Sequence, residues 1–224
     1  MCNTKYVNSS LVNGSFYHIF NRGVEKRTIF TSTSEYYRFL QTLDFYRFYP
    51  TPRKLSTHLR FNTELPKPNF SQKELVKILC FCLMPNHFHL LLQQLEENGA
   101  SEFLRRMADS YTRYFNTKNK RVGPLFQGTF KAKIIKNDEY LLQVSKYIHR
   151  NPVTLSKWNT KVLSDYTFSS YPGYLNSKRN FQFCDTETIS KYFSKNPNLS
   201  YQSFVEEKEG INTPGEILID IDDH

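Results

Sequence analysis

The stretch LVKILCFCLMPNHFHLLLQQ, residues 75–94, contains two apolar runs separated by a single break. The run Leu75–Met84 is apolar and long enough to predict a buried strand. Pro85 and Asn86 interrupt it, and the run His87–Gln94 predicts the next strand. We therefore expect the two strands to pair as a hairpin.

Further strands and helices are predicted on both sides of this pair. The segments 16–23 (FYHIFNRG) and 125–136 (LFQGTFKAKIIK) each predict a strand. Apolar side chains recur at helical spacing over residues 31–49, 101–121 and 138–150, and a shorter helix is expected at 185–195. Residues 51–72 contain several prolines among polar side chains and predict a loop. The order strand, helix, strand, strand, helix, strand, helix predicts a ferredoxin-like, split βαβ fold of the α+β class, an antiparallel sheet with helices on one face.

The charge of the chain is large and uneven. The net charge is +9, yet residues 206–224 contain seven acidic side chains and one basic one. The first 205 residues therefore contain 29 basic and 14 acidic side chains. A body this basic predicts a polyanionic partner, with nucleic acid as the first choice. We expect residues 206–224 to form an acidic tail outside the folded body.

Cysteine usage and hydropathy indicate the compartment. Cys2, Cys80, Cys82 and Cys184 do not form the pattern of a disulfide framework, so reduced thiols in the cytoplasm are expected. The N-terminal residues lack the apolar core of a signal peptide, and no apolar stretch approaches the roughly 18 residues that span a bilayer. We expect a soluble protein with no membrane partner.

His87 and His89 flank a phenylalanine at the start of the second predicted strand. Side chains alternate along a strand, so the two imidazoles project from one face while Phe88 points into the core. Two imidazoles on one face can hold one divalent ion if a third ligand is added, although such pairs also occur by chance. Together with Cys80 and Cys82, the two histidines form the pattern C-x-C-x4-H-x-H, which is a second candidate ligand set, for zinc. That set requires a tight reversal at Pro85-Asn86, and buried thiols are the simpler expectation.

At this point the sequence resembles a known family. MPNHFHLLL is similar to the HUH motif of the single-strand tyrosine transposases, the IS200-like group, in which two histidines hold a divalent ion. The segments FYHIFNRGVEKRTIF, GPLFQGTFKAKII, YIHRNPV and DYTFSSYPGYL resemble, in the same order, segments of the REP-associated tyrosine transposases. The resemblance covers roughly residues 14–176. It implies a transposase domain over residues 1–176, followed by a partly helical extension over 177–205.

The resemblance also implies roles for individual residues. The nucleophilic tyrosine of the family corresponds to Tyr147, and the third metal ligand, four residues later, corresponds to Asn151. The implied activity is cleavage and joining of single-stranded DNA through a 5′-phosphotyrosine, with Mg²⁺ or Mn²⁺ bound by His87, His89 and Asn151. Residues four apart share a helix face, which agrees with this pairing. His149 or a metal-bound water is a candidate to activate the phenol.

The implied partner is single-stranded DNA with hairpin ends, bound by a monomer or a homodimer. Single strands are held by basic grooves and by aromatic side chains that stack on bases. The candidates for these contacts are Arg22, Arg27, Arg105, Arg106, Arg113, Phe126, Gln127, Lys131 and Lys133. A structured nucleic-acid-binding protein with the same fold and no catalysis is the alternative, because related sheets bind RNA without catalysis.

Overall fold

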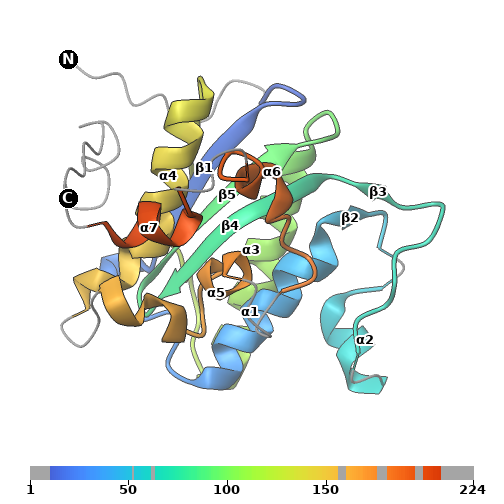
Figure 1. The fold of residues 1–224 in the computed structure, drawn as a ribbon. Helices are drawn as coiled ribbons and strands as arrows, with labels where there is room; N and C mark the ends of the chain where they lie inside the picture. The colour runs from blue at the N-terminus through green and yellow to red at the C-terminus, as the bar shows by residue number, and fades with distance from the viewer. Residues whose placement is uncertain are drawn as a thin grey trace, which may run out of the picture.

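The computed structural model describes residues 11–51, 53–61, 64–155, 160–175, 181–194 and 199–207. Its centre is a four-stranded sheet in the order β4-β5-β1-β6, in which every neighbouring pair is antiparallel (Figure 1). The strands are β1 (Phe16–Arg22), β4 (Val76–Met84), β5 (His87–Gln94) and β6 (Lys131–Ile134). This sheet confirms the predicted ferredoxin-like α+β class.

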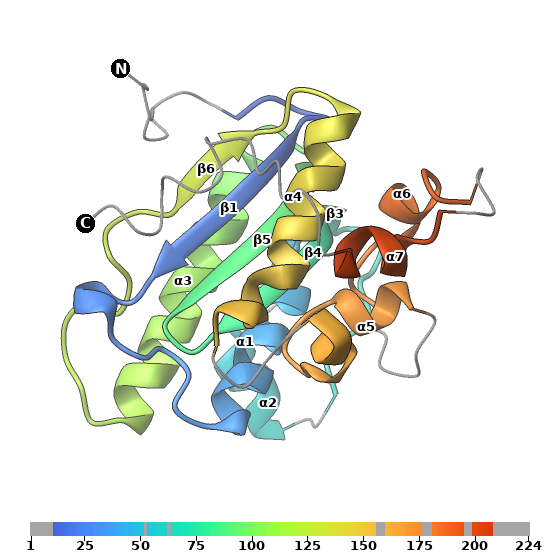
Figure 2. The ribbon, with the colours of Figure 1, turned by 60° about the vertical axis from the view of Figure 1, so that its left-hand side comes forward.

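Helices cover both faces of the sheet (Figure 2). Helices α1 (Thr33–Tyr46) and α3 (Gly99–Lys118) cover one face, as predicted, whereas α4 (Asp138–Arg150) lies across the other. The prediction of helices on one face was therefore incomplete. The reason is that β4 and β5 are buried on both sides, so each face of the hairpin requires an apolar cover.

The turn between β4 and β5 is short and well anchored. Met84 lies opposite His87, and Cys82 lies opposite His89, so only Pro85 and Asn86 separate the two strands. The carbonyl of Pro85 accepts hydrogen bonds from the backbone of Ile29 (2.8 Å) and Phe30 (3.1 Å). The expected hairpin is thus present, and the segment after β1 holds its turn.

Residues 51–72 are not a plain loop. After α1, the two-residue strands β2 (Phe48–Tyr49) and β3 (Lys73–Glu74) pair, and α2 (Leu55–Phe61) lies between them. Leu55 is fully buried and is the only buried side chain of that helix in the described part of the chain. A single apolar anchor produces no periodic signal, which explains why the helix was not predicted.

The chain after α4 forms short helical turns. They are η2 (Asn151–Thr154), η3 (Thr160–Asp165), α5 (Tyr171–Tyr174), α6 (Glu187–Ser190) and α7 (Tyr201–Glu206), and a similar turn, η1 (Val24–Lys26), follows β1. Ile189, Tyr201 and Val205 are buried in the apolar cluster beside α4. The helix predicted at 185–195 is therefore only the short α6. Residues 208–224, most of the predicted acidic tail, lie outside the described residues.

The two edges of the sheet differ. At the β4 edge, Ile78 forms an isolated bridge with Cys184, and Cys82 forms one with Ser169. The amide of Leu83 also donates to the carbonyl of Phe168 at 2.9 Å. Within the described residues, β6 at the opposite edge pairs only with β1. No helix in the described part of the chain is long and apolar enough to cross a membrane.

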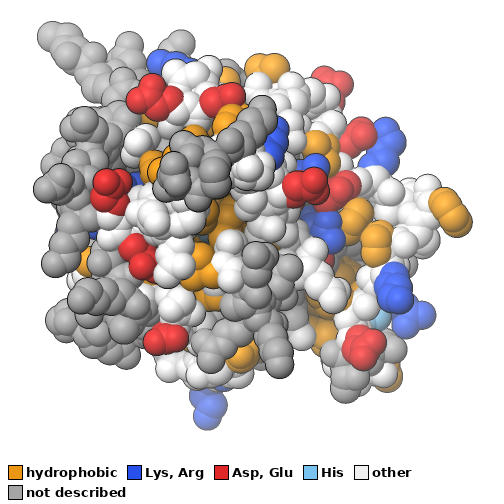
Figure 3. Space-filling model, viewed as in Figure 1, with side chains coloured by type: hydrophobic (Ala, Val, Ile, Leu, Met, Phe, Trp, Pro, Cys, Tyr) orange, Lys and Arg blue, Asp and Glu red, His pale blue; other side chains and the backbone are white. Residues whose placement is uncertain are grey.

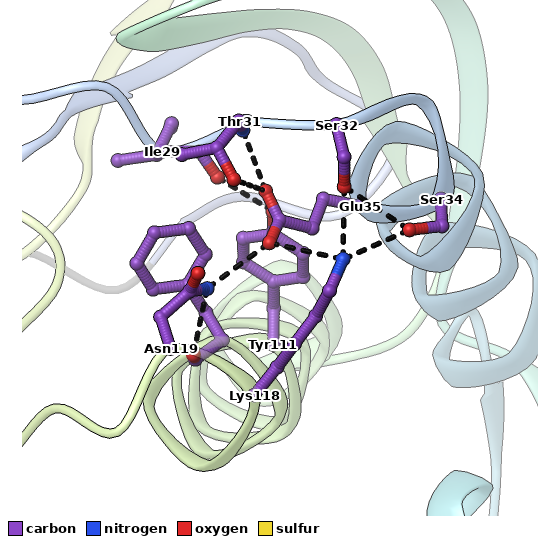
Figure 4. Close-up of polar contacts among 9 residues, drawn as sticks. Ile29, Thr31, Ser32, Ser34, Glu35, Tyr111, Lys118 and Asn119 are labelled. Carbon is purple, nitrogen blue, oxygen red and sulfur yellow. Dashed lines mark hydrogen bonds and ion pairs between the residues drawn. The ribbon is translucent and has the colours of Figure 1, made fainter.

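A buried carboxylate joins α1 to α3 (Figure 4). Glu35 is fully buried and accepts hydrogen bonds from the Thr31 amide (2.5 Å), the Thr31 hydroxyl (2.8 Å) and the Asn119 amide (3.0 Å). Lys118 Nζ lies 3.3 Å from the carboxylate. Burial alone would raise the pKa of Glu35, but these hydrogen bonds outweigh it and hold the pKa below its ordinary value.

The first prediction concerns this carboxylate. Glu35→Ala should lower the free energy of unfolding by about 2 kcal/mol, because buried donors lose their acceptor while the half-exposed Lys118 stays hydrated. Since the folded-state pKa lies below the unfolded one, the stabilisation is present above about pH 4.3 and is lost as the pH falls through the folded value. The free energies of unfolding of wild type and Glu35→Gln, measured by urea denaturation, should therefore differ most at pH 7 and converge in acid. Glu97→Gln, an exposed control, should show no such trend.

Candidate functional site

The two histidines of β5 face α4. Phe88, between them, is 1% exposed and packs on the opposite face against Phe39, with ring centroids 5.1 Å apart. The rings of His87 and His89 lie 5.1 Å apart, centroid to centroid. Strand alternation therefore divides the motif as the sequence predicts, with one ring in the core and two imidazoles on the side of α4.

A third histidine joins them from β1. His18 Nε2 lies 2.9 Å from His89 Nδ1, and both rings are buried. Sequence reasoning did not identify His18 as a site residue. The alternation in FYHIFNRG places it on one face of a strand, but only the pairing of β1 with β5, which sets Phe20 opposite His89, reveals which face.

Helix α4 brings Tyr147 and Asn151 to the same place. The Tyr147 ring lies 5.4 Å from the ring of His89 and 5.9 Å from that of His18. Asn151, which is 5% exposed, has its Oδ1 atom 3.0 Å from His87 Nε2. The helix begins where the Asn137 side chain accepts a hydrogen bond from the Tyr140 amide, at 2.8 Å. It ends at Arg150, where the chain tightens into the turn η2; Asn151 keeps helical backbone angles, and Pro152 lies in the first turn of η2.

The three imidazoles are neutral at pH 7. Burial lowers the pKa of His18 to about 3, with the charge of Lys133 adding to the effect. Burial, aided by the other two histidines, holds the pKa of His89 well below its ordinary value. Burial also lowers the pKa of His87, although the contact with Asn151 opposes the shift. Neutral imidazole is the form that binds a metal ion.

Hydrogen bonds select which nitrogens are free to bind a metal. Asn86 donates its Nδ2 to the carbonyl of Lys26 at 3.2 Å, so its Oδ1 faces His87 Nδ1 at 2.7 Å and that nitrogen carries the proton. The lone pair of His87 Nε2 then faces Asn151 Oδ1, another acceptor. A cation held between them resolves this conflict. Without one, the amide of Asn151 must turn and donate to Nε2.

His89 completes the donor set. Its Nδ1 contacts His18, while its Nε2 is buried without a hydrogen-bond partner among the described residues. The available donors are therefore His87 Nε2, His89 Nε2 and Asn151 Oδ1, and they fit a divalent ion whose remaining positions are filled by water or substrate. The described residues contain no group of three or more histidine, cysteine, aspartate or glutamate side chains arranged for a metal. A three-ligand site therefore requires the side-chain oxygen of Asn151 in addition to the two histidines.

The cysteines near the histidines are buried thiols. The hairpin does place Cys82 directly opposite His89, so the reversal that a mixed zinc set requires is present. However, burial raises the pKa of Cys80 to about 12 and that of Cys82 further, so both remain protonated at pH 7. Cys80 Sγ lies 3.4 Å from the Tyr174 hydroxyl, and Cys82 contacts Met84. These surroundings favour a packing role.

Two residues suggested by the sequence face away from the site. His149 is fully buried, with Nδ1 2.7 Å from the Tyr201 hydroxyl and Nε2 2.8 Å from the Ser170 hydroxyl. It therefore joins α4 to later segments and is not positioned to activate Tyr147. Phe126 is 7% exposed and packs on Phe88, so it is not available to stack on a base, although its neighbour Gln127 is exposed.

The predicted DNA-binding cations divide into groups. Arg22 lies opposite His87, Lys133 opposite His18 and Lys131 opposite Phe20, so all three project from the face that holds the histidines. Arg27 is partly buried and forms an ion pair with Glu25 at 2.9 Å. The remaining three, on α3, lie across the sheet from the histidines; they are Arg105, Arg106 and Arg113.

Comparisons with known proteins find a matching family model and a solved structure of similar fold. Residues 60–151, which include His87, His89, Tyr147 and Asn151, match the family model of the IS200-like transposases. The chain is also similar to a solved structure of a REP-associated tyrosine transposase bound to a REP hairpin, with a TM-score of 0.52 and 16% identity. That match covers 83% of this chain and 92% of the other. No curated protein matches in sequence. The resemblance to IS200-like and REP-associated transposases is confirmed, and the structural match shows the fold.

The second prediction concerns the donor set. Isothermal titration of the DNA-free protein with Mn²⁺ at pH 7 should detect one site, and His89→Ala or Asn151→Ala should weaken it at least about tenfold. His58→Ala, which removes a histidine of α2 remote from the set, should leave the affinity unchanged. Equal affinity in wild type and Asn151→Ala would remove the amide from the ligands.

Proposed function

We propose that the protein cleaves and joins single-stranded DNA, with Tyr147 as the nucleophile and a divalent ion at His87, His89 and Asn151. The observation that carries the proposal is the position of Tyr147. Its ring lies beside His89, one helical turn before Asn151, which contacts His87. A nucleophile next to a set of neutral donors is the arrangement that metal-assisted phosphodiester chemistry requires.

The proposed reaction is a transesterification. The Tyr147 hydroxyl gives up its proton as its oxygen attacks the scissile phosphorus, the bond from phosphorus to the 3′ oxygen breaks, and that oxygen takes up a proton to leave a free 3′ hydroxyl. Bound Mg²⁺ or Mn²⁺ would offset the charge that develops on the phosphate. The phosphotyrosine keeps the energy of the broken bond, so a 3′ hydroxyl can attack it and reseal the strand without a nucleotide cofactor.

The surrounding side chains suit this substrate. Arg22, Lys131 and Lys133 bring positive charge to the face that holds the histidines, where they would attract the phosphates on either side of the cleaved bond. Tyr147 is half-buried between the rings of His18 and His89, which would limit the directions from which its oxygen can approach a phosphate.

We propose a hairpin-bearing single strand as the substrate. The similar solved protein is bound to a REP hairpin, and the chain described here matches 92% of that structure. Duplex stems and single strands are both polyanions, so the strongly basic body is compatible with either part of such a substrate.

The third prediction tests the nucleophile. Wild-type protein incubated with hairpin-bearing single-stranded DNA and Mn²⁺ should yield a covalent protein–DNA adduct that survives denaturing electrophoresis. Tyr147→Phe lacks the attacking oxygen and should reduce adduct formation by at least about a thousandfold, with DNA affinity within about twofold of wild type. Tyr140→Phe, on the same helix, is the matched control and should form the adduct normally.

An adduct that persists in Tyr147→Phe would assign the nucleophile to another residue. Salt-sensitive binding with no adduct from the wild-type protein, with or without Mn²⁺, would instead favour a binding protein without catalysis.

A further inference from the structure

A basic cavity lies on the other side of the sheet, between α1, α2 and α3. Its volume is about 790 Å³, and seven lysine and arginine side chains line it with a single carboxylate, that of Asp109. On the face of the molecule drawn in Figure 3, acidic and basic side chains are interspersed. The lining of the cavity, in contrast, is a concentration of positive charge.

Acidic neighbours neutralise only part of this charge. Arg105 pairs with Glu102 (2.9 Å) and more distantly with Asp109 (3.6 Å). Arg106 lies 3.7 Å from the same glutamate. Lys118 belongs to the Glu35 cluster described above (Figure 4). In the part of the chain that the structure describes, the other four cations of the lining have no acidic partner; they are Arg38, Arg53, Lys54 and Arg113.

Two guanidinium groups of the lining each have one buried donor that is unused among the described residues. Arg38 is 9% exposed and packs over the Tyr114 ring at 5.0 Å, yet its Nε has no hydrogen-bond partner among the described residues. Arg106 packs over Tyr46 and donates to Thr51, but its Nη1 is likewise buried and unused. Buried donors without acceptors cost free energy, and a small shift of either side chain toward the cavity would let an anion there accept from it.

Phosphate is the anion that matches these groups. Guanidinium forks bind phosphate oxygens in pairs, which suits a lining that contains five arginines. Arg106 and Arg113 are separated by seven residues on α3, or about 10 Å along the helix axis. The cations of the lining are thus spread along α3 and across to α1, and a chain of phosphates can contact more of them than a single small anion can.

We infer that this cavity binds the phosphate backbone of a DNA segment other than the one at Tyr147. The sheet separates the cavity from Tyr147, because α1 and α3 cover one face and α4 covers the other (Figure 2). The inference takes from the proposed function only that the ligand is DNA, and it does not require cleavage. The cavity would act as a second anchor.

Charge reversal at the exposed rim tests this inference. Arg53→Glu/Arg113→Glu changes two exposed side chains of the lining, and Lys67→Glu/Lys191→Glu makes the same charge change at exposed positions outside it. Both pairs are combined with Tyr147→Phe, and binding of a fluorescent hairpin DNA is measured without divalent ions over a range of salt. The rim variant should bind at least about tenfold more weakly than the control, with the log–log salt slope reduced by about two.

Three results would overturn the inference. Equal affinity and salt slope in the rim variant and its control would show that the cavity does not contact DNA. Saturable binding of AMP that the rim variant loses, with DNA binding unchanged, would make it a nucleotide site. The rim substitutions can also be made in protein that retains Tyr147. If that protein cleaves saturating DNA more slowly than wild type, the cavity would be part of the cleavage site and not a separate DNA contact. Because affinity is measured without cleavage, failure of the Tyr147 assignment would leave the binding result interpretable.

Arg38→Met provides a second measurement inside the cavity. It keeps most of the side-chain length and removes the buried charge, so it should weaken hairpin binding while thermal unfolding of the free protein stays at or above the wild-type temperature. Weaker binding together with a lower unfolding temperature would point to loss of structure instead.

Discussion

The two-residue turn at Pro85-Asn86 is the constraint on which the site depends. It fixes the register of β4 against β5, and so determines which side chains share a face with His87 and His89. A shift of one residue would exchange the two faces and bury the imidazoles against α1 and α3. The turn also orients a ring directly, because the Asn86 side chain holds His87 Nδ1 and leaves Nε2 directed toward Asn151. The same short segment thus fixes both the fold and the tautomer.

The histidine cluster contains ring nitrogens that are buried away from solvent. Among the described residues, His18 Nδ1 and His89 Nε2 are buried without hydrogen-bond partners, and such atoms cost roughly 1–3 kcal/mol each. A fold selected for stability alone would fill these positions with apolar side chains, as it does elsewhere on β5. The cost is understandable if the free nitrogen of His89 has a ligand and His18 holds the other nitrogen of that ring.

Much of this arrangement could be predicted from local patterns. Alternation was enough to separate Phe88 from its two neighbours, whereas Tyr147 and Asn151 were paired through the family resemblance, with which their four-residue spacing agrees. What remained hidden depends on contacts between distant segments. His18 required the register of β1 against β5, and the orientation of His149 required the later segment that carries Ser170 and Tyr201. Phe126 looked exposed because a short stretch of sequence does not show that α3 and β5 cover its ring.

The unequal edges of the sheet limit the route that a long polymer can follow around the molecule. Later segments close the β4 edge through the bridges at Cys184 and Ser169, whereas β6 has a neighbour on only one side in the described part of the chain. A DNA molecule in contact with both faces would therefore pass around β6, where Lys131 and Lys133 lie. The DNA would then bend around this open edge. The length of DNA between a stem and its cleaved bond would be set by the width of one strand and the thickness of the sheet.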